Sequence, residues 1–324
     1  MKTFNNLIVG LKSKKSDTPD FWEENGLLNY VVPGYWVQKK IEYQQGNFNN
    51  IRPKLPKFTG TEKLVISNIE SLFKTNIEKF VASDSLRSAV IRPALQGIFF
   101  SNKYTVATNS HILLRHNKVT SNIDIILPLP GYRILKKLYK LKTHVALTVL
   151  SYKFKTKKGL WASNWYLRAV TGDYTVHIKL IDESYPATAN HIPDAPYPNR
   201  MNISNFEISE LKATLKSFDV KTTRHLVFDS SKNKVTAKNV NQDITIGAYL
   251  PFMYSDLIGL GLNYLKIVLS NFKTADIVRN SSPLRPQVFY TKDLDLLIMP
   301  VNLPVKLEVW YTEQRKIRQS ITRK

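Results

Sequence analysis

Apolar residues recur at helical spacing in three stretches of the chain, 69–80, 134–141 and 208–218. In each stretch Ile, Leu or Phe repeats at intervals of three or four residues, which places these side chains on one face of a helix. Many of the remaining positions are polar, so each helix would have an apolar side and a polar side. The pattern predicts three amphipathic helices.

The rest of the chain from residue 63 onward contains short runs rich in β-branched and aromatic residues. Two pairs of runs are joined by the polar turns 101–103 and 230–233, which indicates antiparallel hairpins. We therefore predict an α+β protein with antiparallel sheets. The predicted strands are 96–100, 104–108, 144–152, 165–171, 175–180, 226–229, 234–237, 244–249, 265–270, 287–290 and 296–299.

Two short matches relate the halves of the chain to each other. Ile-Ser-Asn occurs at 66–68 and again at 203–205, next to two of the predicted helices, and 103–109 is similar to 233–239. The offsets are 137 and 130 residues. In a chain rich in Asn, Lys and Ile, such matches are compatible with an internal duplication and equally with chance.

The chain has 324 residues, enough for two or three domains with cores of their own. Hydrophobic residues make up 43%, and 12 Gly and 16 Pro are typical of a globular protein. There is no cysteine, which excludes disulfides and thiolate metal sites. No apolar stretch approaches the ~20 residues of a membrane helix, and residues 1–6 lack the apolar core of a signal peptide. We expect a soluble cytoplasmic protein, or one of the host cytoplasm if a phage encodes it.

Composition divides the chain into an N-terminal extension and linker (1–62), two domains (63–180 and 181–303) and a basic tail (304–324). The formal net charge is +22, and most of it lies in 63–180, with 19 Lys and Arg against 5 Asp and Glu. Charge of one sign repels itself unless a polyanion relieves it. We therefore expect the protein to bind nucleic acid.

Common catalytic and nucleotide-binding motifs are absent, including the Walker A, dinucleotide-binding, zinc-protease and nucleophile-elbow patterns. His111 and His116 lie five residues apart, a spacing that suits neither one face of a helix nor one face of a strand, so no metal site is predicted. The acidic pairs 182–183 and 293–295 leave a metal-dependent nuclease open as an alternative. We predict a protein that is not an enzyme and has no cofactor and no catalytic residue.

One predicted helix carries a row of cations. Arg133, Lys136, Lys137 and Lys140 follow an i, i+3, i+4, i+7 pattern and share a face opposite the apolar residues. A solvated helix surface would have the same pattern, but the charge of this segment favours contact with DNA or RNA phosphates. No zinc-finger spacing, recognition-helix pair or aromatic RNA-binding strand is present, so we expect binding that does not depend on base sequence.

Two neighbouring stretches resemble the middle domain of the bacterial DNA polymerase III sliding clamp, or beta subunit. They are 92–97, RPALQG, and 107–113, ATNSHIL, where that family typically shows RPAL-x-G and ATDGHRL. Asn109 and Ser110 stand where the family has Asp and Gly, and Ile112 stands where it has Arg.

Two later stretches match the same family in the same order. Residues 180–186 with 191–193 are similar to the junction between the clamp's middle and last domains, and 296–303 is similar to the VMPMRL run near its end. Asn302 replaces an Arg of that run. The resemblance covers 63–303.

The resemblance implies two DNA-clamp-like domains of antiparallel sheets, with amphipathic helices lining the inner face of a ring around double-stranded DNA. Residues 1–62 are too few for the first domain of a three-domain clamp. Two matched domains per chain would close a ring as a homotrimer through head-to-tail interfaces, with a dimer or monomer as alternatives. The expected DNA-binding residues lie on polar helix faces: Lys74, Arg133, Lys136, Lys137, Lys140, Lys212 and Lys216.

A second implication is an apolar pocket for a short peptide of a replicative DNA polymerase or of a clamp loader. Several of the matching positions would be core residues in any β-rich domain, so a structural role stays open for them. The changes at Asn109, Ser110, Ile112 and Asn302 indicate an altered polar rim. The matching positions are Leu95, Thr108, Ser110, His111, Leu113, Pro186, Ile298, Met299, Pro300 and Val301.

The high positive charge does not fit this family, whose members are generally acidic. It supports an alternative, namely a clamp-fold structural or virion protein of a phage or mobile element that binds nucleic acid without forming a sliding ring. The sequence leaves both interpretations open.

Overall fold

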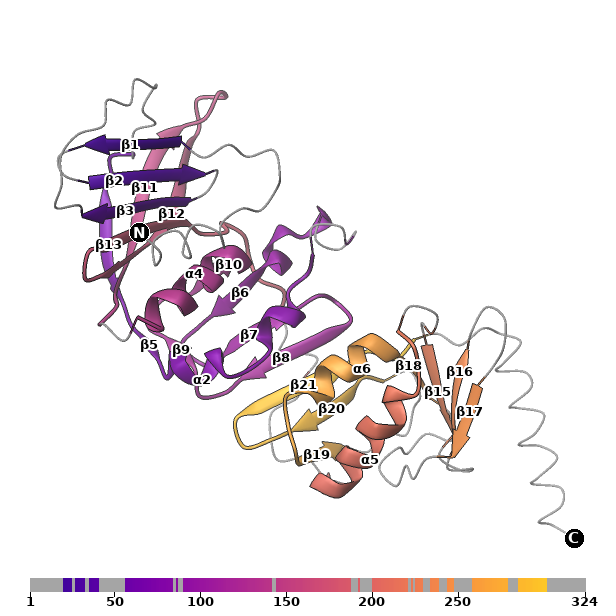
Figure 1. Ribbon diagram of the computed structural model, residues 1–324. Coiled ribbons are helices and arrows are strands. Elements are labelled where there is room, and N and C mark those ends of the chain that lie inside the picture. Colours follow the sequence, from indigo (N-terminus) through magenta and orange to yellow (C-terminus); the bar gives the residue numbers. More distant parts are fainter. Residues whose placement is uncertain are drawn as a thin grey trace, which may run out of the picture. The chain divides into compact units, whose positions relative to one another are not determined.

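The computed structural model describes residues 20–24, 27–32, 35–40, 56–83, 86, 90–141, 144–187, 192, 200–220, 223, 225–229, 234–238, 244–247, 258–278 and 285–301. The chain forms two compact units, Met1–Ala187 (unit 1) and Thr188–Lys324 (unit 2). Both consist of antiparallel strands with a few short helices (Figure 1), as the predicted α+β class requires. None of the described helices is long and apolar enough to cross a membrane.

Unit 1 contains two large sets of antiparallel strands. One has the order β1 (Asp20–Glu24), β2 (Leu27–Val32), β3 (Tyr35–Lys40), β13 (Tyr174–Lys179), β12 (Trp161–Thr171), β11 (Ala146–Lys155) and β4 (Gly60–Leu64). The other has the order β10 (Ile125–Pro128), β6 (Gly97–Phe100), β7 (Thr105–Thr108) and β8 (Ile112–His116). The short strands β5 (Ile66–Ser67) and β9 (Thr120–Ser121) pair separately.

The described helices of unit 1 are α2 (Ile69–Phe73), α4 (Leu129–Tyr139) and the 3-10 helices η1 (Ile77–Phe80) and η2 (Pro93–Gln96). Helices α2 and α4 pack side by side, because the Phe73 ring lies 5.7 Å from the Tyr132 ring and 5.3 Å from the Tyr139 ring. At Gly131 of α4 a Cβ atom would lie 2.6 Å from Ile178 Cγ2, so a larger residue would push the helix away from β13.

Unit 2 also contains two sets of antiparallel strands. One has the order β17 (Ile244–Gly247), β16 (Lys234–Lys238), β15 (His225–Asp229) and β18 (Ile258–Gly261). The other has the order β21 (Leu294–Ile298), β20 (Gln287–Tyr290), β19 (Ala275–Val278) and β14 (Arg200–Ile203). The described helices are α5 (Asn205–Lys216) and α6 (Leu262–Leu269). A capping box between Ser204 and Glu207 fixes the start of α5.

Among the described elements, a motif of one strand, one helix and three strands occurs four times. In unit 1 it runs β4-α2-β6-β7-β8 and then β10-α4-β11-β12-β13, and in unit 2 it runs β14-α5-β15-β16-β17 and then β18-α6-β19-β20-β21. In every case the first strand pairs with a strand of the other motif of its unit, as β4 does with β11 and β10 with β6. The duplication suggested by the sequence is therefore present in the topology, and each half is itself doubled.

Three described strands lie within residues 1–62, which were predicted to be an N-terminal extension and linker. Strands β1, β2 and β3 form a meander, and β3 pairs with β13. They add three strands to the sheet of unit 1. Residues 304–324, the predicted basic tail, lie outside the described residues.

Ten of the eleven predicted strands coincide with described strands, and the predicted helices at 134–141 and 208–218 coincide with α4 and α5. The predicted strand 265–270 is wrong, because these residues belong to α6 and the C-cap that follows it. Leu262, Leu265, Val268 and Leu269 are all buried, and this spacing is helical. The short run of apolar and β-branched residues was compatible with a buried strand as well as a buried helix.

His177 on β13 is a buried titratable residue of unit 1, with 6% of its surface exposed. Its ring stacks on Phe58 at 5.9 Å, and its register partner on β12 is Arg168. The Nδ1 atom has no hydrogen-bond partner among the described residues. Burial, with a smaller effect from the charge of Arg168, lowers the pKa of His177 to about 4.

This lowered pKa predicts a pH-dependent stability. An unfolded histidine takes up a proton near pH 6.5, whereas folded His177 does so only near pH 4. The stabilisation is therefore complete above about pH 6.5, and we expect the free energy of unfolding to fall by about 3 kcal/mol as the pH drops to about 4. Urea unfolding of the wild type and His177→Phe across this range measures the difference. Parallel pH profiles for the two proteins would contradict the assignment.

Candidate nucleic-acid interface and peptide pocket

Helix α4 carries the predicted row of cations. Its buried side consists of Gly131, Tyr132, Ile134, Leu135 and Leu138. On the polar side, Arg133 and Lys140 are exposed, and Lys136 and Lys137 are half-buried. The predicted amphipathic helix is thus present, and its cations lie at different depths.

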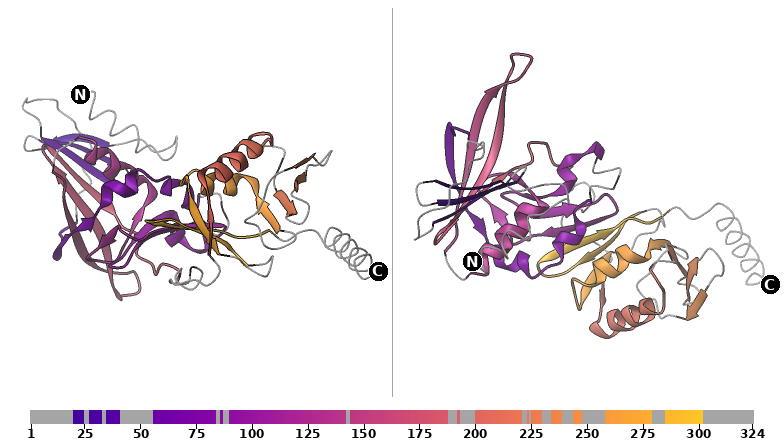
Figure 2. Two further views of the ribbon diagram at one scale, coloured as in Figure 1. Left: turned by 90° about the horizontal axis from the view of Figure 1, so that it is seen from below. Right: turned by 45° about the horizontal axis from the view of Figure 1, so that its top comes forward.

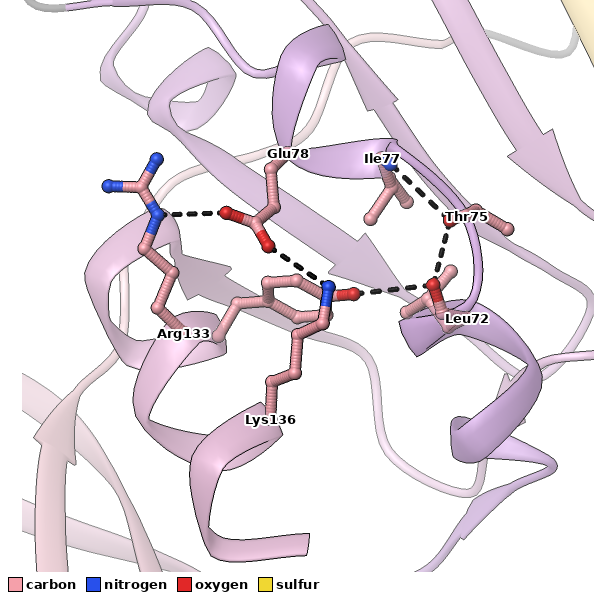
Figure 3. Close-up of polar contacts among 7 residues, drawn as sticks. Leu72, Thr75, Ile77, Glu78, Arg133 and Lys136 are labelled. Carbon is pink, nitrogen blue, oxygen red and sulfur yellow. Dashed lines mark hydrogen bonds and ion pairs between the residues drawn. The ribbon is translucent and has the colours of Figure 1, made fainter. Parts of the chain in front are cut away.

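Glu78 on η1 holds two of these four cations. Its Oε2 accepts a hydrogen bond from Arg133 Nε at 2.9 Å, and its Oε1 accepts one from Lys136 Nζ at 3.2 Å (Figure 3). Burial by itself would raise the pKa of Glu78, but the hydrogen bonds and charges of Arg133 and Lys136 outweigh it and hold the pKa below its usual value. The role of Glu78 was not predicted from the sequence, because a contact across 55 residues leaves no local signal.

Tyr132 anchors the buried side of the same helix. Its hydroxyl donates to the Leu72 carbonyl oxygen at 3.3 Å, at the end of α2. Lys136 Nζ lies 5.9 Å from the centre of the Tyr132 ring. Burial raises the pKa of Tyr132 well above its usual value, so the hydroxyl keeps its proton and remains a donor. These contacts fix the cationic face of α4 relative to α2.

The other predicted DNA-binding lysines differ in exposure. Lys74, which caps α2, and Lys216, in the last turn of α5, are exposed. Lys212 is half-buried, and its Nζ donates to the Phe272 carbonyl oxygen at 3.0 Å. Burial and the charge of Lys273 lower the pKa of Lys212. Lys212 thus has an internal partner, whereas an exposed position was expected.

Lys212 extends from α5 to a carbonyl oxygen beyond the end of α6, and Lys266 on α6 makes the reciprocal contact beyond the end of α5. Its Nζ donates to the Phe218 carbonyl oxygen at 3.1 Å, two residues beyond the end of α5. Lys212 reaches Phe272 in the same way, three residues beyond the end of α6. Each helix therefore supplies a cation to carbonyl oxygen near the C-terminal end of the other, a position where positive charge is favourable.

Six of the predicted pocket residues lie in unit 1. Leu95 and Leu113 are buried, Thr108 is 8% exposed, Ser110 and His111 are exposed, and Pro186 is half-buried. Thr108 and Leu113 face each other across the β7–β8 pair. The Thr108 amide donates to the hydroxyl of Tyr185, the residue before Pro186, at 3.1 Å. The structure therefore brings the end of β7, the start of β8 and the segment around Pro186 together.

The turn between β7 and β8 contains the substitutions noted in the sequence. Asn109 Oδ1 accepts hydrogen bonds from the amides of His111 and Ile112, both at 3.0 Å. An aspartate oxygen could accept the same two bonds, so Asn retains the geometry. Ser110 has a φ of 76°, in the left-handed region that favours glycine. The glycine of the family pattern suits this conformation, which Ser110 adopts at an energetic cost.

The remaining predicted pocket residues lie at the end of β21 in unit 2. Ile298 is fully buried, whereas Met299, Pro300 and Val301 are half-buried. The Val301 amide donates to the Gly259 carbonyl oxygen of β18 at 2.9 Å. Ile298 is therefore a core residue, and the following three present part of their surface to solvent.

A cavity of about 450 Å³ in unit 1 was not predicted from the sequence. None of the predicted pocket residues lines it, although Tyr185 does, with its ring stacked 5.1 Å from that of Phe99. Trp165 forms part of the wall. Four carboxylates also line the cavity: Glu62, Asp124, Asp182 and Glu183.

His116 and the acidic pair 182–183 are among the candidate metal and nuclease residues. His116 is buried, with Nε2 3.0 Å from Ser71 Oγ and Nδ1 accepting from the Lys118 amide at 3.3 Å. Asp182 and Glu183 are exposed. Across the described ranges, no group of three or more His, Asp or Glu side chains is placed to hold a metal ion.

Two units built from paired strand–helix–three-strand motifs define a sliding-clamp fold, and solved clamp structures match the chain. The beta sliding clamp of Caulobacter crescentus superposes with a TM-score of 0.65 at 12% identity, over 93% of this chain and 98% of that one. The DNA polymerase III beta subunit of Borrelia burgdorferi gives 0.59 at 14% identity, over 93% and 98%. The Pseudomonas aeruginosa sliding clamp gives 0.54 at 15%, over 92% and 81%.

The resemblance to the bacterial beta clamp inferred from the sequence is thus confirmed at the level of the fold. No protein-family model matches the chain, and no curated protein does.

Proposed function

We propose that this protein is a DNA sliding clamp, a non-enzymatic processivity factor that encircles duplex DNA. The observation that carries the proposal is the sliding-clamp fold, with its fourfold repeated motif. A clamp holds DNA by topology, so its helices need positive potential but no specific fit to the bases.

The cations on the helices support contact with the DNA backbone. The exposed cations are Arg133 on α4, Lys140 at the C-cap of α4, Lys74 at the end of α2 and Lys216 on α5. Lysine and arginine contacts to phosphates are individually weak and exchange readily, which lets a protein slide along DNA. We assign these residues, together with Lys136, Lys137 and Lys212, to the DNA-facing surface.

For partner binding, we propose that a short peptide from a replicative polymerase, and from a clamp loader, docks beside the β7–β8 turn. The turn presents Ser110 and His111 at the surface, next to the buried pair Thr108 and Leu113. Pro186 offers further apolar surface in unit 1. In unit 2, considered by itself, we assign the half-buried segment 299–301 to peptide binding as well. Methionine beside proline suits an adaptable peptide site.

For the ring, we propose a homotrimer closed by pairing of edge strands. Strand β17 ends one strand set of unit 2, and among the described strands only β16 pairs with it. Strand β1 ends the large sheet of unit 1, where only β2 pairs with it in the described part of the chain. An edge strand has unpaired backbone groups that another chain can satisfy.

The second candidate is a clamp-fold protein that coats or packages nucleic acid without forming a ring. The net charge of +22 favours it, because such a charge suits tight binding to a polyanion better than free sliding. The two candidates differ in oligomeric state, because only the clamp forms a ring. They also differ in DNA retention, because only the clamp requires a closed DNA circle.

Topological retention on DNA tests the proposal. The full chain is incubated with nicked circular plasmid and passed through a sizing column at about 0.5 M salt, which weakens phosphate contacts. A sliding clamp stays with the circle and is lost when one restriction cut linearises it. Negative-stain class averages and mass photometry should then show a six-domain ring. Equal retention on circular and linear DNA, with no ring in the images, would favour the second candidate.

A further inference from the structure

Strands β11 and β12 extend beyond the sheet to which they belong. Strand β4 pairs with β11 only over Leu147–Ser151, and β13 pairs with β12 only over Tyr166–Thr171. The β11–β12 pairing itself continues outward to Lys155 and Trp161. Residues 152–165 therefore form a projecting two-stranded hairpin (Figure 2), called here the β11–β12 ribbon.

One face of the ribbon is occupied by aromatic side chains that contact one another. The rings of Tyr152 and Phe154 stack at 5.8 Å, and both residues are half-buried. At the base of the same face, Tyr166 lies edge-on to Phe58 at 5.5 Å. Such contacts stabilise a hairpin that has no neighbouring strand in the described part of the chain. This face has a structural role.

The opposite face presents a tryptophan to solvent. Trp161 is 69% exposed, and its register partner Lys155 places Nζ 5.3 Å from the centre of a Trp161 ring. Lys153 lies on the same face, two residues along the strand from Lys155, and is exposed. Leu160 in the adjoining turn is 66% exposed. Trp161 and the neighbouring Leu160 thus expose apolar surface beside two lysines, and this combination suits a binding site.

The segment of the sequence that contains this tryptophan carries only positive charge. Residues 125–172 contain ten Lys and Arg and no Asp or Glu. Four of these cations, Lys153, Lys155, Lys157 and Lys158, are exposed on the ribbon. Arg133 and Lys136 of α4 have Glu78 as a partner, whereas among the described residues no ion pair involves the ribbon lysines. The ribbon therefore fits an anionic partner with flat apolar groups.

We propose that the β11–β12 ribbon binds single-stranded nucleic acid, with an unpaired base stacked on Trp161 and the flanking phosphates beside Lys153 and Lys155. Every unpaired base presents a π-face that can stack on an aromatic ring, and lysines track the backbone without reading sequence. A duplex keeps its base faces inside the stack, so it can use only the lysines. The proposed site is separate from the α4 face and does not depend on ring formation.

Trp165 marks the inner limit of this site. It lies on the same face of β12 as Trp161, four residues away and 41% exposed. However, it lines the cavity that also contains Glu62, Asp182 and Glu183. Carboxylates repel phosphates, so the binding surface covers the outer part of the ribbon. Trp165 is therefore a matched control, because it has the same chemistry and strand face but the opposite electrostatic surroundings.

Fluorescence anisotropy of the full chain with labelled dT and rU oligonucleotides of about 20 nucleotides, and with a blunt duplex of equal length, tests the proposal. Trp161→Ala should weaken binding of both single strands about tenfold or more, whereas Trp161→Phe should retain most of the affinity. Trp165→Ala should change it less than about twofold, and duplex binding should change little in any of these variants. In the wild type, the oligonucleotides should also quench tryptophan fluorescence, and Trp161→Phe should lose that quenching.

Three results would overturn the proposal. One is an equal loss of single-strand and duplex affinity in Trp161→Ala, which would indicate damage to the fold. Another is an equal effect of Trp161→Ala and Trp165→Ala. The third is Trp161-dependent binding to phosphatidylserine vesicles without Trp161-dependent binding to oligonucleotides, because a membrane would then be the partner. Short linear oligonucleotides require no ring, so a failure of plasmid retention leaves this test unaffected.

Discussion

Changing Glu78, Arg133, Lys136 and Lys140 together to glutamine should weaken binding to duplex DNA and make that binding less dependent on salt. Each lost phosphate contact removes about 0.9 from the slope of log affinity against log salt concentration, so the slope should lie about three below that of Glu78→Gln, in which all three cations are free to contact phosphates. Glu78 is included because without its two partners it would be a half-buried, unpaired carboxylate. Anisotropy titrations with a duplex at several salt concentrations measure the slope.

Glu78→Gln alone provides a control with the opposite sign. It keeps the shape of the side chain and removes the charge that holds Arg133 and Lys136 at 2.9 and 3.2 Å. Both cations then become available to phosphates, so we expect tighter duplex binding and a steeper slope. An unchanged slope in the fourfold variant would show that this face of α4 does not contact DNA.

Tyr132→Ala should lower the free energy of unfolding by about 3–5 kcal/mol, because it empties the space of a fully buried aromatic residue between α4 and α2. The ring of Tyr132 contacts Phe73, and its hydroxyl donates to the Leu72 carbonyl oxygen. Urea denaturation followed by far-UV circular dichroism measures the loss.

Tyr132→Phe separates packing from hydrogen bonding. It keeps the ring, and the Leu72 oxygen still accepts from the Thr75 amide at 3.0 Å and from Thr75 Oγ1 at 2.7 Å. The cost should therefore be about 1 kcal/mol. Similar losses for the Ala and Phe variants would contradict the packing role given to the ring.

Local sequence chemistry was sufficient to predict the hairpins. In the turn between β6 and β7, the Ser101 amide donates to the Tyr104 carbonyl oxygen at 3.1 Å, and Ser101 Oγ accepts from the Tyr104 amide at 3.2 Å. These bonds join residues three apart, so the residues that specify the turn also close it. The clamp fold could also be predicted from the sequence, because its motifs are local. The motif at 92–97 lies at η2, and the motif at 107–113 joins β7 to β8.

The predicted helix over 69–80 shows where periodicity is insufficient. The structure divides it into α2 and η1. Thr75 causes the break, because its hydroxyl donates to the Leu72 carbonyl oxygen at 2.7 Å and accepts from the Ile77 amide at 3.3 Å. A side chain that bonds to its own backbone competes with the helix, and the apolar spacing continues across the interruption.

The candidate site was predicted only in part, since its remaining determinants are tertiary. Glu78 lies 55 residues from Arg133, and the carbonyl oxygen that binds Lys212 lies 60 residues away. The charge pattern placed cations on helices, but the contacts that hold three of them arise only when distant segments pack together. The ribbon was overlooked for a similar reason, because a projecting hairpin and a sheet interior have the same strand pattern.

The reciprocal contacts of Lys212 and Lys266 make the two helices of unit 2 dependent on each other. Loss of either ammonium group removes a hydrogen bond at the far end of the opposite helix, so fraying that begins at one helix would propagate to its neighbour. Replacing either lysine would therefore destabilise both α5 and α6, and the surface that the two helices form would lose its structure cooperatively.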